Sequence, residues 1–139
     1  AHVFAGIQMH DGPAEKLALI ERLRARGYPV LDLSDNEMAK LHIRNMVGGH
    51  TRPRVANEIL YRFEFPERPG ALLHFLNRIG QRWNISLFHY RNHGAAYGRV
   101  LVGVQVPPAE RTAFQTFLDD VGYTCREESG NPAYDLFLG

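Results

Sequence analysis

The chain has little of several residue types, and each shortage narrows what the protein can be. Only one of its 139 residues is a cysteine, Cys125, which excludes an internal disulfide and favours a reducing compartment. No apolar run approaches the ~20 residues that a membrane-spanning helix requires. We therefore expect a cytoplasmic protein with no membrane partner.

The chain also lacks a long block of charge of one sign. It has 16 Lys and Arg against 15 Asp and Glu, which gives a formal net charge of +1, and the charges are interspersed. Arms that bind nucleic acid and patches that bind membrane surfaces need clustered basic residues. We therefore expect no nucleic-acid partner, and the 45% of hydrophobic residues are typical of a globular protein.

The groups that covalent or metal chemistry requires are sparse. The chain has only two lysines, Lys16 and Lys40, and no glycine-rich segment that could cradle the phosphate of pyridoxal phosphate. His89 and His93 are four residues apart, but they straddle a predicted strand end and a turn instead of sharing a helix face. We expect no catalytic residue, no metal site and no cofactor in this segment.

Residues 59–128 show a clear alternation of strand and helix patterns. Apolar residues recur at every second position in 59–65 and 100–106, as in half-buried strands. The predicted order is strand 59–65, helix 71–80, strand 85–90, strand 100–106, a helix from Pro107 to Gly122, and strand 123–127. This order predicts an α+β, ferredoxin-like βαββαβ unit, with an antiparallel sheet and both helices on one face.

The first part of the chain repeats part of this pattern. Gly6-Ile7-Gln8-Met9 resembles Gly103-Val104-Gln105-Val106, and both are followed by Pro-Ala-Glu, a helix pattern and Gly-Tyr. We interpret residues 1–33 as the second half of a first unit: strand 3–9, helix 14–26 and strand 28–33. The first half of that unit is expected upstream of Ala1, so the chain is expected to be a fragment.

Two further segments complete the predicted organisation. Ser34 and Glu37 have the spacing of a capping box, which predicts a helix to about Val47 within an inter-unit segment 34–58. Residues 129–139 are expected to be an extension, with a further strand at 133–138. Strand 3–9 would otherwise expose an apolar edge, so it is expected to pair with strand 133–138 or with a second copy of the chain.

Three motifs resemble one protein family. They are Phe65-Pro66-Glu67-Arg68-Pro69-Gly70-Ala71-Leu72, the segment 83–91 (WNISLFHYR) and the segment 31–44 (LDLSDNEMAKLHIR). All three are similar to the C-terminal ACT-like regulatory region of biosynthetic threonine dehydratase (threonine ammonia-lyase), and the resemblance extends over essentially the whole chain.

The resemblance implies an ACT fold and a regulatory role. Members of this family join a catalytic domain, which uses pyridoxal phosphate to convert threonine to 2-oxobutanoate and ammonia, to a pair of ACT-like units. Isoleucine binds that pair and inhibits, valine opposes it, and the parent enzyme is usually a tetramer. The expected partners of this chain are therefore isoleucine, valine, the catalytic domain of the parent chain and further copies in a homo-oligomer.

The effector site is predicted at the turn that precedes helix 71–80. Free amides at a helix start attract a carboxylate, Asn84 offers an amide, and the arginines could clamp an acid group. The candidate effector-binding residues are Glu67, Arg68, Gly70, Ala71, Leu72, Asn84, Ile85, Arg44 and Arg91.

Structural interpretations of the same residues stay open. Gly70 can simply make a turn, the leucines can be core, and the arginines can form surface ion pairs. Two other functions also remain: a ferredoxin-like sheet that binds RNA through the strand aromatics Phe88 and Tyr90, and an oligomerisation module without a ligand.

Overall fold

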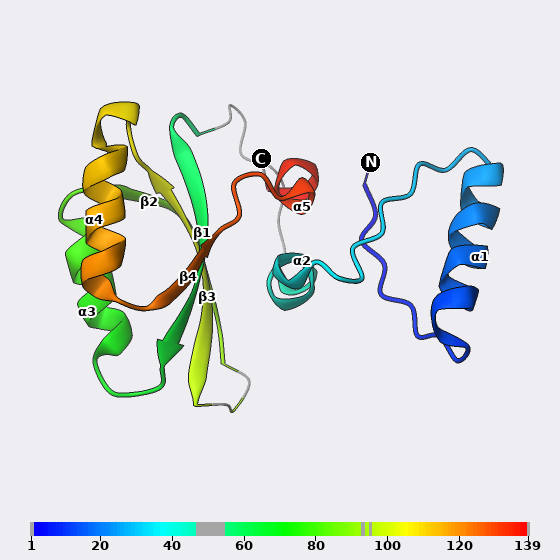
Figure 1. The fold of residues 1–139 in the computed structure, drawn as a ribbon, viewed down its shortest axis with the longest axis horizontal. Helices are drawn as coiled ribbons and strands as arrows, with labels where there is room; N and C mark the ends of the chain where they lie inside the picture. The colour runs from blue at the N-terminus through cyan, green and yellow to red at the C-terminus, as the bar shows by residue number, and fades with distance from the viewer. Residues whose placement is uncertain (1, 47–54, 93, 95, 139) are drawn as a thin grey trace.

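A computed structural model describes residues 2–46, 55–92, 94 and 96–138 of the chain (Figure 1). Its helices and strands are α1 (Gly12–Ala25), α2 (Glu37–Leu41), η1 (a 3₁₀ helix, Ile43–Asn45), β1 (Glu58–Pro66), α3 (Ala71–Gly80), β2 (Asn84–Arg91), β3 (Tyr97–Gln105), η2 (a 3₁₀ helix, Pro108–Glu110), α4 (Arg111–Val121), β4 (Thr124–Glu127) and α5 (Pro132–Phe137). Within these ranges, no helix is long and apolar enough to cross a bilayer.

The four strands form one antiparallel sheet in the order β2-β3-β1-β4. The long strand β1 lies inside the sheet, where Tyr61 is opposite Val102 of β3 on one side and Glu127 of β4 on the other. With α3 and α4 as its crossovers, the unit is the predicted βαββαβ arrangement. The ferredoxin-like, α+β fold class is confirmed.

The face of the sheet that α3 and α4 cover holds an aromatic core. Alternate residues of β1 point to this face, and among them Phe63 is 1% exposed. The Phe63 ring packs against Phe75 of α3 with centroids 4.9 Å apart, and Phe114 of α4 is also buried there. The alternation in the sequence predicted this face correctly because the strand period of two separates the two faces.

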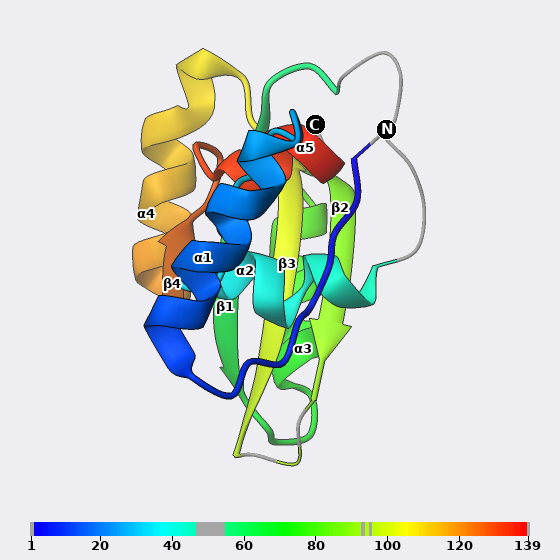
Figure 2. The ribbon, with the colours of Figure 1, turned by 90° about the vertical axis from the view of Figure 1, so that its right-hand side faces the viewer.

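The opposite face of the sheet is also covered, which the sequence did not indicate. Leu60 and Leu101 are fully buried there beneath α2 and α5, which lie across the sheet from α3 and α4 (Figures 1 and 2). Met38 of α2 and Tyr134 of α5 belong to the same apolar cluster. The sheet therefore lies between two helical layers: α3 and α4 share one face, as predicted, and α2 and α5, which lie outside the βαββαβ unit, cover the other.

The predicted strands of the N-terminal segment are wrong. Residues 3–9 and 28–33 form no strand, and Val3 and Ile7 remain 86% and 58% exposed. An isolated strand pattern gains no ladder hydrogen bonds, so alternation alone does not fold it. The helix between them is confirmed as α1, which has Pro13 in its first turn but buries no residue and stands beyond α2 and α5 from the sheet (Figure 1).

The predicted strand at 133–138 is wrong as well, because this segment is helix α5. The side chain of Asn131 accepts a hydrogen bond from the amide of Ala133 at 3.0 Å, and Pro132 follows at the first helical position. Both residues favour a helix start. The segment therefore offers no strand edge to residues 3–9, which meet it through a ring contact between Phe4 and Phe137 instead.

The inter-unit helix starts later than the sequence predicted. The N-cap is Asn36, whose side chain accepts from the amide of Ala39, while the Ser34 hydroxyl donates to Asp32 one turn earlier. Glu37, the expected second half of the capping box, pairs with Arg62. Helix α2 ends at Leu41 and is followed by η1, and the predicted helix end at Val47 lies outside the described residues.

Candidate functional site

The turn at Gly70 is built as the sequence predicted. Gly70 is the N-cap of α3 with φ +83°, a left-handed conformation that glycine adopts without strain. A Cβ added there would meet nothing within 4 Å, and no side chain caps the helix start. The first amides of a helix have no partner within the helix, so this open start can receive an anion.

Glu67 and Arg68 hold the turn rather than face a common pocket. The amide of Glu67 donates to Ala96 at 2.8 Å, and its carboxylate accepts a hydrogen bond from the Tyr90 hydroxyl, which raises the pKa of Tyr90. Arg68 is exposed, and its carbonyl accepts from the amide of Ala71 at 3.3 Å. Glu67 is therefore committed to fixing the turn against β2.

The apolar candidates lie at the edge of the aromatic core. Ala71 is buried, whereas Leu72 is half-buried and packs against that core from the first turn of α3. Ile85 is also half-buried and contacts the same core from β2. Only Leu72 combines partial exposure with a position directly behind Gly70.

Asn84 lies at the other end of the unit from Gly70. It begins β2 opposite Gln105, which also pairs with Glu58 at the start of β1, whereas Gly70 follows the end of β1. Asn84 donates to the side chain of Gln105 at 2.5 Å. Helix α3 separates the two sites by its ten residues, about 15 Å, so one chain does not bring Gly70 and Asn84 together.

Arg44 and Arg91 lie away from the start of α3. Arg44 is exposed on η1, and Arg91 at the end of β2 donates to the carbonyl of Leu41 at 3.3 Å. Beside this contact, His42 and His89 share a hydrogen bond between their Nδ1 atoms at 2.9 Å. Arg91 and His89 therefore fasten α2 to the edge strand β2.

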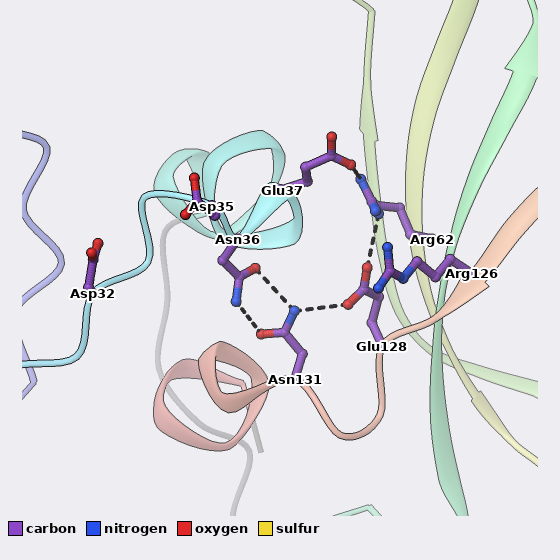
Figure 3. A pocket seen from close by; sticks show the side chains of 8 residues that line it. All are labelled: Asp32, Asp35, Asn36, Glu37, Arg62, Arg126, Glu128 and Asn131. Atoms are coloured by element: carbon purple, nitrogen blue, oxygen red, sulfur yellow. Dashed lines mark hydrogen bonds and ion pairs between the residues drawn. The ribbon is translucent and has the colours of Figure 1, made fainter. Parts of the chain in front are cut away.

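A polar network on the α2 and α5 side was not expected from the sequence (Figure 3). Arg62 of β1 donates through Nη1 to Glu37 at 2.6 Å and through Nε to Glu128 at 3.1 Å. Asn36 and Asn131 exchange two amide hydrogen bonds, and Asn131 also donates to Glu128 at 2.8 Å. The partners come from segments far apart in the chain, so no local pattern could have revealed them.

The network surrounds an open hollow of about 540 Å³ that lies between α2, β4 and the start of α5. All of its lining residues are polar or charged: Asp32, Asp35, Asn36, Glu37, Arg62, Arg126, Glu128 and Asn131. Arg62, and to a smaller extent Arg126, hold the pKa of Glu37 below its ordinary value. Hydrogen bonds from Ser34 and Lys16 lower the pKa of Asp32.

Comparison with known proteins identifies the family. A family model described as the C-terminal regulatory domain of threonine dehydratase matches residues 51–138, which include the whole βαββαβ unit. The chain belongs to this family.

Curated relatives extend the similarity to the N-terminal segment. The chain is 52% identical over 139 residues to the L-threonine dehydratase biosynthetic IlvA of Escherichia coli (strain K12), and 47% identical over 138 residues to the mitochondrial threonine dehydratase of Saccharomyces cerevisiae. Each match covers 99% of this chain but only 26% and 24% of the relative. The chain spans about a quarter of the length of the threonine dehydratases it matches, and it corresponds to their regulatory part.

The described residues of this regulatory domain do not suit pyridoxal phosphate. Lys16 forms an ion pair with Asp32 at 2.9 Å on the exposed α1, and Lys40 is exposed on α2. Lys16 is thus engaged by Asp32 and Lys40 lies at the surface, whereas a lysine that holds this cofactor has to be positioned in an enclosed site. Among these residues no three His, Cys, Asp or Glu side chains gather as metal ligands, and His93 of the predicted histidine pair lies outside them.

Proposed function

We propose that this domain senses isoleucine as a feedback inhibitor and valine as the opposing effector of a biosynthetic threonine dehydratase. The parent enzyme would be a cytoplasmic lyase that deaminates threonine to 2-oxobutanoate with pyridoxal phosphate held in its catalytic domain. Its usual tetramer would make the domain part of a homo-oligomer. The membership in the regulatory family supports this proposal.

The observation that carries the proposal is the open start of α3. Gly70 leaves room above the helix start, where backbone amides and the positive end of the helix dipole favour a carboxylate. Leu72, half-buried directly behind Gly70, offers an apolar contact for a branched side chain. We place the effector here, and Asn84 would take part only through a second unit, since one amino acid is shorter than α3.

Opposite actions of two similar effectors need two states of the protein. Isoleucine and valine differ by one methylene, about 0.8 kcal/mol, or roughly fourfold in affinity. Unequal binding to one state cannot reverse the sign of an effect, so each effector would favour a different packing of the regulatory units. In this scheme residues 1–33 belong to a first unit, 34–58 connect, 59–128 form the second unit and 129–139 extend it.

The RNA-binding alternative gains no support from the fold. Phe88 and Tyr90 lie opposite Val102 and Val100 of β3 on the edge strand β2, where they are 39% and 38% exposed, but the Tyr90 hydroxyl is engaged by Glu67. The face of the sheet opposite α3 and α4 is covered by α2 and α5, so no open platform for bases is available there (Figure 2).

Calorimetric titration of the chain with isoleucine tests the proposal. The variant Leu72→Phe fills the space beside Gly70 and should weaken isoleucine binding at least tenfold, roughly the effect of an ill-fitting side chain in an apolar site. Leu73→Phe is the matched control, because Leu73 is the next residue of α3 and is 62% exposed. Isoleucine affinity that is the same in both variants would contradict the placement.

A further inference from the structure

The sheet carries two arginines directly opposite each other next to the polar hollow. Arg62 of β1 and Arg126 of β4 are paired residues in the antiparallel register. Like charges at such positions repel, because their Cβ atoms are only about 5 Å apart. Anions that compensate both charges would stabilise such a pair.

Within the described residues, direct ion pairs reach only one of these two arginines. Arg62 is held between Glu37 and Glu128, and its side chain is 11% exposed. The third arginine of this region, Arg99, pairs with Glu64. Arg126 is exposed and makes no hydrogen bond or ion pair with any described residue, so its guanidinium is available to an anion from outside.

The opposite wall of the hollow presents exposed carboxylates. The side chain of Glu37 is 67% exposed and gives only one oxygen to Arg62, so the other faces outward. Asp35 is exposed on the same wall and forms no ion pair with a described residue. A simple anion at Arg126 would be repelled by these carboxylates, whereas a molecule with both charges would be attracted at both ends.

We propose that this hollow binds a free amino acid, with its carboxylate on Arg126 and its ammonium toward Glu37 on the opposite wall, where Asp35 adds a second negative charge. This inference rests on the proposed function in that the domain senses free amino acids, but it adds a second site on the other side of the sheet from α3. The lining residues include no apolar side chain, so the site favours a small amino acid over isoleucine or valine.

The floor of the hollow is rigid enough to position such a ligand. The paired amides of Asn36 and Asn131 each also cap a helix, and Arg62 bridges α2 to Glu128, the residue directly after β4. A ligand that joined Arg126 to Glu37 would add a second bridge between the same elements. Its binding would therefore fasten α2, which follows the N-terminal segment, to the sheet.

Titration of the full chain with L-threonine as the probe, followed by calorimetry and by the thermal midpoint, tests this site. Arg126→Gln should weaken L-threonine binding at least tenfold, as loss of a charge-assisted contact does, and Asp35→Asn should weaken it less. Arg111→Gln on the exposed side of α4 is the matched control and should bind as the wild type does. Propionate and propylamine, which each carry one of the two charges, should bind much more weakly.

Three outcomes would overturn the inference: no L-threonine binding at millimolar concentration, equal binding by Arg126→Gln and Arg111→Gln, or equal binding of propionate. A parallel titration with isoleucine tests the proposed function independently of this second site. Isoleucine binding that Leu72→Phe abolishes and Arg126→Gln leaves intact supports the α3 site whether or not L-threonine binds. L-threonine binding that depends on Arg126 supports the second site even where isoleucine does not bind.

Discussion

Asn36 and Asn131 lie 95 residues apart and exchange two side-chain amide hydrogen bonds, from Asn36 Nδ2 to Asn131 Oδ1 at 2.7 Å and from Asn131 Nδ2 to Asn36 Oδ1 at 3.1 Å. Each carbonyl oxygen also accepts a hydrogen bond from the backbone amide of its own helix start. The pair therefore joins the first turn of α2 to the first turn of α5, the two helices that cover the second face of the sheet.

Replacement of either asparagine by alanine should destabilise the domain. Loss of the cap costs about 1 kcal/mol, and the unpaired amide of the partner adds about 1 kcal/mol more. The double variant Asn36→Ala/Asn131→Ala should lose about 1 kcal/mol less than the two single variants lose together, because each single variant already removes the interaction that the two residues share. Urea unfolding measures these differences. Asn77→Ala, at an exposed position of α3, is the control and should not reduce stability.

The contact between His42 and His89 predicts a loss of stability at acid pH. Burial, and secondarily the charge of Arg91, lower the pKa of His89 in the folded protein. The unfolded chain therefore binds more protons, and its histidine pKa is about 6.5. The contribution of the neutral, buried His89 to the free energy of unfolding is complete above pH about 6.5 and is lost as the pH falls through the lower pKa of His89 in the folded protein.

Unfolding free energies measured between pH 7.5 and pH 5 test the histidine prediction. These two limits lie about one pH unit or more above and below the pKa of a histidine in the unfolded chain. His89→Gln should flatten the dependence in this window. His74→Gln, at an exposed position of α3, should leave it unchanged. The role assigned to His89 would be wrong if both variants followed the wild-type curve.

Gly70 and Gly80 should respond to alanine in opposite directions. A Cβ meets nothing within 4 Å at either position, so neither substitution creates a clash. Gly70 has φ +83°, where an L-residue costs about 1–2 kcal/mol. Gly80 is helical, and alanine there should gain about 0.5 kcal/mol or slightly more. Thermal midpoints that shift in the same direction in both variants would contradict this expectation.

Phe75 should be the most costly side chain to remove from α3. It is fully buried, and its ring centroid lies 4.9 Å from those of both Phe63 and Phe65. Phe75→Ala should cost about 3–5 kcal/mol because it leaves a cavity in an aromatic core. Leu73→Ala, on the same helix but exposed, should change the free energy of unfolding by less than about 0.5 kcal/mol. Denaturant titration measures both values.

The sequence predicted those parts of the fold whose causes are local. The alternation in β1 and β3 and the apolar stripe of α3 follow from which face each residue presents, and all three elements were found. Residues 3–9 show the same alternation without forming a strand, because strand formation also needs a partner that the pattern does not specify. Similarly, the N-cap at Asn36 instead of Ser34 goes together with the pairing of Asn36 with Asn131, a partner 95 residues away.

The same distinction between local and long-range causes applies to the candidate sites. The turn at Gly70 could be predicted because a glycine conformation and a helix start are properties of consecutive residues. The distance between Gly70 and Asn84 could not, since it depends on the direction of α3 relative to the sheet. The network around Arg62 joins residues 25 and 66 positions away in the sequence, and only the folded chain brings them together.

The position of β1 inside the sheet sets the order in which the chain can assemble. The β2–β3 hairpin closes between Arg91 and Arg99, so it can form as soon as both strands have been synthesised. The pairing of β1 with β4 joins Tyr61 to Glu127, 66 residues later, and must wait for nearly the whole unit to leave the ribosome. Until then β1 keeps one apolar edge open, and the nascent chain is most exposed to mispairing with its neighbours during that interval.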